Sequence, residues 1–304
     1  MQNGIKPLAN ENQPLLTGSL ICPGCGKLIS AYLEECSFCG LKEPARKKQI
    51  AKLLTLGQGS FVKPIIGLCI LLFGLGYLLP LLIPGLPGAR PGGGLLGFLP
   101  APSSAALALL GWADPRLILA GHYHLLITAI FLHAGFLHII FNLLWVRDLG
   151  AQAELVLGHK AMFLVFVVAG VLGNALAVFG PMVLLSLGIE TQLAPIVGAS
   201  GAVFGLMGAM MAFAKRLPGG IGLDLARQMG KWALVLILLG FVFPGISNAA
   251  HIGGFVGGVG VGRLLPLKKG LKAQAGLDLF TLATMGLVAF AFLYQTYLVL
   301  LVLS

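Results

Sequence analysis

The chain has 304 residues, of which 58% are hydrophobic and only 10% are charged. Soluble domains carry about 25% charged residues, so this composition excludes a soluble globular protein and indicates a polytopic membrane protein. The net charge of +10 does not indicate nucleic-acid binding, because the basic residues follow the predicted membrane topology.

The segment before the apolar part of the chain divides into three. We expect residues 1–20 to be disordered, 21–41 to form a small cysteine-containing module, and 42–61 to be a basic linker. The linker begins "KEPARKKQIAK" and suits a position against anionic lipid of the inner leaflet. The first 19 residues are polar and lack the apolar core of a signal peptide. We therefore expect the first membrane span to target the protein.

Four of the five cysteines form the pattern Cys22-x2-Cys25-x10-Cys36-x2-Cys39. Four thiolates at this spacing suit tetrahedral zinc. Two disulfides are disfavoured by the predicted cytosolic location, and rubredoxin-like iron could use the same ligands. We predict a zinc-ribbon-like module with a structural Zn²⁺, and leave open whether it recruits a cytosolic partner, regulates the membrane domain or only anchors the N-terminus. Cys69, in the first span, is expected to be a small buried hydrophobe.

Seven apolar runs approach the length needed to cross about 30 Å of hydrocarbon. They lie near 62–84, 125–147, 161–180, 197–214, 231–247, 249–266 and 279–303. If the N-terminus is cytosolic and the spans alternate, only Arg90 and Arg116 of the 20 Lys and Arg residues lie outside, as the positive-inside rule expects. The C-terminus is then outside, and we expect an integral protein of a bacterial inner or plasma membrane.

Two of the runs carry glycines at helical spacing, which lets helix backbones approach closely. The fourth contains Gly198, Gly201, Gly205 and Gly208, and the sixth contains Gly254, Gly258 and Gly262. Most of these glycines are expected only to pack helices. A polar residue, Ser200 or His251, stands at the head of each seam. If the seams pack together, the two side chains can meet near the outer end of the bundle, and a serine bonded to a neutral imidazole is an activated nucleophile.

The second span adds His138 and Asn142, four residues apart on one helical face. Their side chains and the backbone N–H of Ser200 could stabilise an oxyanion. No Asp is placed to complete a triad, so we expect a dyad. His133 is expected to point elsewhere and to anchor the long loop 84–123. Taken singly, each group has a plainer interpretation, because serine bonds its own helix, histidine can be a transport ligand, and asparagine can join helices.

Together these residues resemble the rhomboid family of intramembrane serine proteases. The resemblance rests on "HAGFLHIIFN" in the second span, "GAQAELVLG" just after it, "GASGAVFG" in the fourth and "AHIGGFVGG" in the sixth. It implies an all-α polytopic fold with a six-helix core at 62–266 and a linker and seventh transmembrane helix at 267–304. It also implies that Ser200 and His251 form the dyad and that His138 and Asn142 support the oxyanion. Residues expected to serve helix packing are Gly150, Glu154, Gly158, Gly201, Gly205, Gly254 and Gly258.

The resemblance departs from the family pattern before the second span, where Tyr123 and His124 replace a frequent Trp-Arg pair. This leaves open how the long loop, expected to be half-embedded in the outer interface, is held. We predict a serine endopeptidase that cleaves single-span membrane proteins near the outer boundary, with no catalytic cofactor and no nucleic-acid partner. The alternatives are a catalytically silent rhomboid-like binder of membrane clients and a transporter that uses the intramembrane histidines.

Overall fold

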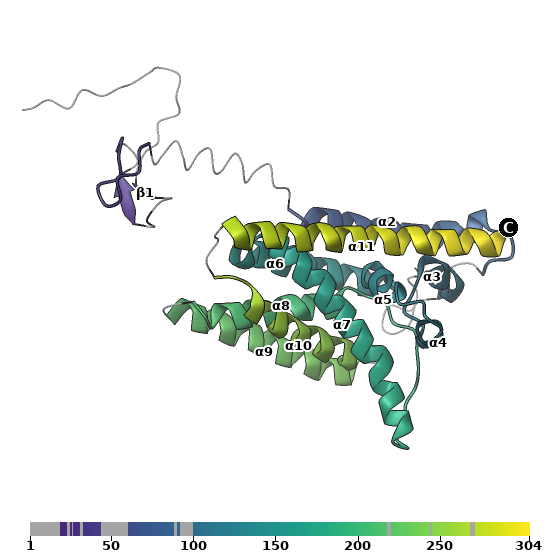
Figure 1. The fold of residues 1–304 in the computed structure, drawn as a ribbon. Helices are drawn as coiled ribbons and strands as arrows, with labels where there is room; N and C mark the ends of the chain where they lie inside the picture. Colours follow the sequence, from purple (N-terminus) through teal and green to yellow (C-terminus); the bar gives the residue numbers. More distant parts are fainter. Residues whose placement is uncertain are drawn as a thin grey trace, which may run out of the picture. The chain divides into compact units, whose positions relative to one another are not determined.

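The structure is a computed structural model. It describes residues 19–22, 25, 27–30, 33–43, 60–87, 90–91, 100–217, 220–243, 245–267 and 271–304. The chain divides into two compact units, Met1–Gly59 and Ser60–Ser304 (Figure 1). Most of the predicted disordered segment 1–20 and most of the basic linker lie outside the described residues, but the prediction is wrong at Ser19 and Leu20, which belong to a β-strand.

The N-terminal unit is a small β-structure. Strands β1 (Ser19–Ile21) and β2 (Leu28–Ser30) pair antiparallel, with Leu20 opposite Ile29. Among its described residues, Cys22, Ile29 and Cys36 form a small buried cluster, against which Leu41 packs. Two of the cysteines are thus buried at the centre of a unit too small to have a large apolar core.

The second unit contains seven helices of 15 or more residues among its described residues. They are α2 (Val62–Leu82), α6 (Phe136–Leu157), α7 (His159–Ser186), α8 (Ser200–Ala214), α9 (Gly220–Val242), α10 (Asn248–Leu264) and α11 (Leu271–Leu303). Shorter elements lie between α2 and α6. They are β3 (Arg90–Pro91), β4 (Pro100–Ala101), α3 (Ser104–Leu110), α4 (Pro115–Leu119), α5 (Leu125–Thr128) and the 3-10 helix η2 (Ala129–Phe131).

Each predicted apolar run therefore contains a helix, but not every helix has the dimensions of a membrane span. Among the described residues, four helices, α2, α7, α9 and α11, are long and apolar enough to cross a membrane, and a bent pair makes a fifth. The helices of the other two predicted spans, α8 and α10, have 15 and 17 residues and are too short for this criterion. Helix α8, with 15 residues, is only about 22 Å long. It is enclosed by other helices instead, and Ser200 and Met211 are its only residues that are not buried.

The second predicted span, at 125–147, is wrong in its bounds. Residues Leu125–Phe131 and Phe136–Leu157 form two helical pieces with a bend of 91° between them. The backbone is extended at Leu132 and at Gly135, which interrupts the helix. An unbroken apolar run hides such a break, because hydropathy does not report backbone direction. At its other end α6 continues to Leu157, beyond the predicted span. Gly150 and Glu154 therefore lie inside this helix rather than after it.

Helix α8 occupies the centre of the helical unit and packs against α6, α7, α9 and α10 (Figure 1). Its contact with α10 is backbone against backbone. A Cβ atom at Gly254 would overlap the carbonyl oxygen of Gly201, and one at Gly258 would overlap that of Gly205. The two glycine seams are in contact along two turns, and this contact sets the distance between the first turns of α8 and α10.

Candidate active site

Ser200 and His251 lie opposite one another where α8 and α10 begin. Ser200 is the first residue of α8. His251 lies in the first turn of α10, whose N-terminus is capped by Ser247 through a 3.2 Å hydrogen bond from the N–H of Ala250. The Ser200 Oγ and His251 Nε2 atoms are 2.9 Å apart, which is hydrogen-bonding distance. Ser200 is half-buried and His251 is buried.

The imidazole of His251 is held by an aromatic ring as well as by the serine. Phe204, one turn after Ser200, stacks on it with ring centroids 4.2 Å apart and an angle of 14° between the planes. The His251 Nδ1 atom is buried and has no hydrogen-bond partner among the described residues. Sequence reasoning did not single out Phe204, although its i+4 spacing from Ser200 places it on the same face of α8.

His138 approaches the site from α6. Its Nδ1 atom accepts a 3.4 Å hydrogen bond from the backbone N–H of Ala134, so in the neutral ring the proton is assigned to Nε2. A Cβ atom at Gly198 would lie 2.7 Å from that Nε2 atom. The imidazole N–H therefore lies against the backbone two residues before Ser200, and only a glycine leaves room for it.

Asn142 is buried on the same helix, one turn after His138. Its side-chain Nδ2 atom donates a 2.8 Å hydrogen bond to the carbonyl of His138. This bond fixes the amide next to the histidine and occupies one of its two N–H groups.

His133 does not point away from the site as expected. It lies in the break between η2 and α6 and is 1% exposed. Its ring is 5.2 Å from that of His138, in an edge-to-face arrangement. The expectation assumed a continuous helix, on which residues five apart face different directions. The bend removes that constraint and brings the two rings together.

The segment before Ser200 is tied to the loop that precedes α5. Ala113 and Ile196 exchange two backbone hydrogen bonds of 3.0 and 3.1 Å. The N–H of Gly198 donates a further 2.9 Å bond to the carbonyl of Ala129. Of the two residues that replace the Trp-Arg pair, Tyr123 is exposed, whereas His124 is buried and bonds to Gln295 of α11 at 2.8 Å.

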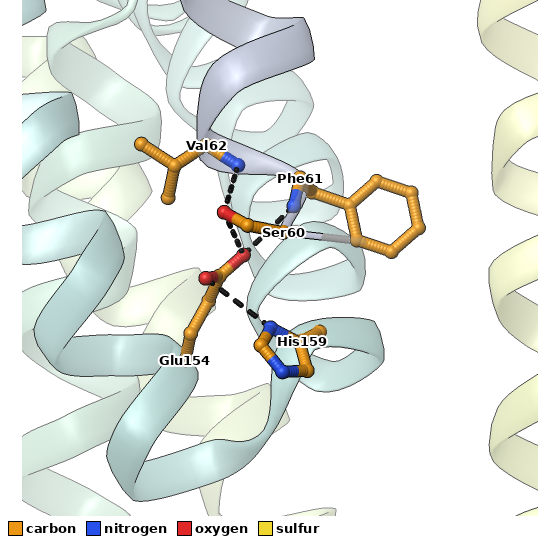
Figure 2. A network of polar contacts seen from close by, with 5 residues as sticks. All are labelled: Ser60, Phe61, Val62, Glu154 and His159. Atoms are coloured by element: carbon orange, nitrogen blue, oxygen red, sulfur yellow. Dashed lines mark hydrogen bonds and ion pairs between the residues drawn. The ribbon is translucent and has the colours of Figure 1, made fainter. Parts of the chain in front are cut away.

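Glu154 is part of a polar network at the start of α2 (Figure 2). One carboxylate oxygen accepts hydrogen bonds from the Phe61 N–H at 2.8 Å and the Ser60 hydroxyl at 3.1 Å. The other lies 3.2 Å from the Nδ1 atom of His159. The Ser60 oxygen in turn accepts a bond from the N–H of Val62. Glu154 thus satisfies donors at a helix N-terminus.

The two glycines flanking Glu154 have different surroundings. Gly150 lies beside α2, where a Cβ would come within 2.9 Å of Val62. Gly158 has φ +94° and links the end of α6 to the start of α7. A side chain at Gly158 would strain the backbone of this turn.

The four N-terminal cysteines converge. Their sulfur atoms all lie within 4.8 Å of one another, with Cys22 and Cys39 at 3.7 Å and Cys25 and Cys36 at 3.8 Å. Four sulfurs at about 2.3 Å around one tetrahedral ion would be about 3.8 Å apart. The cluster therefore fits a metal ion bound by four thiolates. Gly40, directly after the last cysteine, has φ +68° and closes the second turn.

The thiol of Cys39 has a perturbed pKa. The backbone N–H of Leu41 lowers it, but desolvation and the neighbouring thiols of Cys25, Cys36 and Cys22 act in the opposite direction and raise the pKa to about 12. Without a cation, the neighbouring thiols thus disfavour the thiolate form of Cys39. A divalent ion would remove that resistance.

Comparison with known proteins identifies the class. The model of the rhomboid domain matches residues 120–268, which contain α5 to α10 and both residues of the candidate dyad. The chain contains a rhomboid domain over residues 120–268, which confirms the expected resemblance. Several relatives of this chain are named as rhomboid proteases, and the described residues contain four helices long and apolar enough to cross a membrane.

Individual relatives come from bacteria and a plant. Rhomboid protease GluP of Bacillus subtilis (strain 168) is 29% identical over 261 residues, covering 84% of this chain and 44% of GluP. RHOMBOID-like protein 5 of Arabidopsis thaliana is 32% identical over 55% of this chain and 52% of its own length. Rhomboid protease GlpG of Yersinia pestis (strain Pestoides F) is 31% identical over 42% and 43%. The chain thus spans roughly half of the length of these relatives.

Proposed function

We propose that this protein is an intramembrane serine endopeptidase that uses a dyad of Ser200 and His251. The observation that carries the proposal is the 2.9 Å distance between the serine Oγ and the histidine Nε2. The imidazole of His251 can accept the serine proton only if its Nε2 atom is unprotonated. This Nε2 atom is the one that faces the Ser200 hydroxyl. The rhomboid domain and the protease names of the relatives support the same chemistry.

The reaction is acyl transfer. As the Ser200 oxygen attacks the carbonyl carbon of the scissile peptide, its proton passes to His251 Nε2. The negative charge that develops on the carbonyl oxygen is stabilised by the backbone N–H of Ser200, with His138 Nε2–H and the Asn142 amide as further donors. The protonated His251 then donates its proton to the leaving amine, and water hydrolyses the acyl-enzyme.

The substrate is proposed to be a single-span membrane protein that is cleaved near the outer membrane boundary. The backbone of a membrane helix is already hydrogen-bonded internally, so its scissile peptide must first leave the helix. Sequences with weak helix propensity and small residues are therefore the preferred targets.

We also propose a topology and a location in a bacterial inner or plasma membrane. The N-terminal unit and its basic linker lie in the cytosol, and the C-terminus lies outside. The distribution of Lys and Arg supports this orientation, because only Arg90 and Arg116 fall on the outer side.

The dyad is tested by cleavage of a single-span substrate in proteoliposomes by wild type, Ser200→Ala and His251→Ala. Ser186→Ala is the matched control, because that hydroxyl is exposed and bonds only the Val183 carbonyl in its own helix. We expect cleavage by wild type and the control alone. Equal cleavage by all four proteins would refute the dyad, and cleavage by none across several substrates would favour the silent client-binding alternative.

For the N-terminal unit we propose a structural Zn²⁺ bound by Cys22, Cys25, Cys36 and Cys39. The sulfur separations of 3.7 and 3.8 Å support this assignment. The ion would stabilise a unit whose apolar core is small. We assign the ion no role in peptide cleavage. We propose that the folded module is available to a cytosolic partner. Metal analysis of the purified protein tests the identity of the bound ion. Iron in place of zinc would overturn the assignment.

A further inference from the structure

Gln295 is a polar residue in an apolar helix. It lies in α11. The part of this helix that could span a membrane, Ala275–Leu303, is covered very little by the rest of the protein. An amide in such a helix is unfavourable unless its donors and acceptor are satisfied. Gln295 itself is half-buried, so its side chain faces the protein.

Both ends of the Gln295 amide are bonded to other elements. Its Nε2 atom donates to the carbonyl of Leu109 at 2.8 Å and also contacts that of Ala108 at 3.4 Å. Its Oε1 atom is 2.8 Å from His124 Nε2, which donates to it. Leu109 lies in the last turn of α3, where the helix offers no N–H partner for a carbonyl. The glutamine therefore satisfies a carbonyl group at the C-terminal end of α3.

The end of α3 is fixed from a second direction. Gly111, which terminates this helix with φ +94°, accepts a 2.5 Å hydrogen bond from the Thr128 hydroxyl at its carbonyl oxygen. A Cβ at Gly111 would lie 3.2 Å from Gln295 Cγ. The turn after α3 is thus enclosed between α5 and α11.

Backbone hydrogen bonds join the residues after this turn to the segment that precedes the candidate nucleophile. Two residues after Gly111, Ala113 pairs with Ile196 through two backbone hydrogen bonds. Ile196 precedes Ser200 by four residues, and the Gly198 between them contacts His138. A displacement of the end of α3 would therefore move the segment that orients the serine.

We infer that Gln295 is a positioning residue. It holds the loop before α5 and thereby the backbone segment that leads from Ile196 to Ser200. The inference rests on the proposed proteolysis. It assigns α11 an indirect role in the active site, because Gln295 bonds Leu109 and His124 rather than Ser200 or His251. It also accounts for how the loop is held in a chain without the Trp-Arg pair, since His124 is the other partner of this amide.

The test compares Gln295→Met, which keeps the length but removes both hydrogen bonds, with Thr296→Val. Thr296 is the matched control, because its hydroxyl is exposed and bonds only the Phe292 carbonyl in its own helix. Three quantities are measured in detergent below the unfolding transition. These are the hydrogen exchange of the amides of residues 111–113, the rate at which a fluorophosphonate labels Ser200, and kcat and KM for a single-span substrate.

For Gln295→Met we expect exchange at residues 111–113 to rise about tenfold, and the labelling rate and kcat to fall about tenfold, as the loss of a partly buried hydrogen bond implies. KM should change by less than about twofold, because the lesion affects alignment of the nucleophile. Thr296→Val should match wild type. Unchanged exchange, or faster exchange with unchanged labelling and kcat, would overturn the inference.

Two outcomes separate this inference from its premises. If Gln295→Met does not fold, His124→Phe removes only the second hydrogen bond, and the same three changes are expected at about threefold. Wild-type rates in that variant would overturn the role. If wild type is neither labelled nor active, the proposed protease activity is wrong. Faster exchange in Gln295→Met would then support only the role of Gln295 in holding the loop before α5.

Discussion

The contact between the two glycine seams provides the sharpest test of the site, through Gly254→Ala. The new Cβ would overlap the carbonyl oxygen of Gly201, one residue after the nucleophile, and would lie 3.1 Å from its Cα atom. Both of these atoms belong to the backbone and cannot rotate away. Helices α8 and α10 must therefore separate by roughly 1 Å at this level to reach an ordinary contact.

The separation acts directly on the dyad, because His251 lies three residues before Gly254 on the same face of α10. A 2.9 Å hydrogen bond lengthened by roughly 1 Å is lost. Misplacement on this scale costs about 100-fold in rate, and overpacking destabilises the fold by about 1–3 kcal/mol. We expect Gly254→Ala to fold with a lower transition temperature and to cleave about 100-fold more slowly.

Gly260→Ala is the matched control, since it adds the same methyl group to the same helix where no atom lies within 4 Å. Initial rates of cleavage in proteoliposomes and thermal unfolding in detergent are measured for both variants and wild type. Gly260→Ala should keep the wild-type rate. A Gly254→Ala enzyme that cleaves within about twofold of wild type would show that the seam does not set the dyad geometry.

Three further predictions concern other parts of the chain. Glu154→Gln should destabilise the helical unit by about 1–2 kcal/mol in thermal unfolding, because it weakens charge-assisted bonds at the start of α2. Glu190→Gln, at an exposed position, is the control and should have no effect. Equal unfolding temperatures for the two variants would contradict the role of the network. Cleavage should decline as the pH is lowered, because protonated His251 cannot accept the serine proton; a constant rate between about pH 4 and pH 9 would be incompatible with the dyad. Cys25→Ser should lower the bound zinc well below the expected value of about one per chain, whereas Cys69→Ala should retain it, and equal metal contents would contradict the assigned ligands.

The residues of the site could be predicted from the sequence because their spacing is tied to helix geometry. Glycines at i, i+4 and i+8 define a face, so Ser200 and His251 could be placed at the heads of two facing seams. The close approach of α8 and α10 and the 2.9 Å pair agree with that reasoning. The cysteine cluster could be anticipated in the same way, because two C-x-x-C turns separated by a short stretch leave few alternatives to convergence.

The features that were missed depend on backbone direction and on contacts between distant segments. The bend before Phe136 cannot be inferred from hydropathy, and it alone brings His133 next to His138. The role of Gln295 could not be inferred either, because its partner carbonyls lie 186 and 187 positions away. One signal was present, since a glutamine in an apolar helix calls for a partner.

The polar side chains of the helical unit differ in what they bond, and this difference separates structure from chemistry. Glu154, Gln295 and Arg216 all serve helix ends, the last through three carbonyls at the end of α10. Helix ends are where backbone groups lack partners, and a bilayer core offers no water to satisfy them. Ser200 and His251 instead bond one another through side-chain atoms and satisfy no helix end with that bond. A polar pair that helix termination does not require, held by backbone contacts that only glycine permits, is better explained by reactivity than by folding.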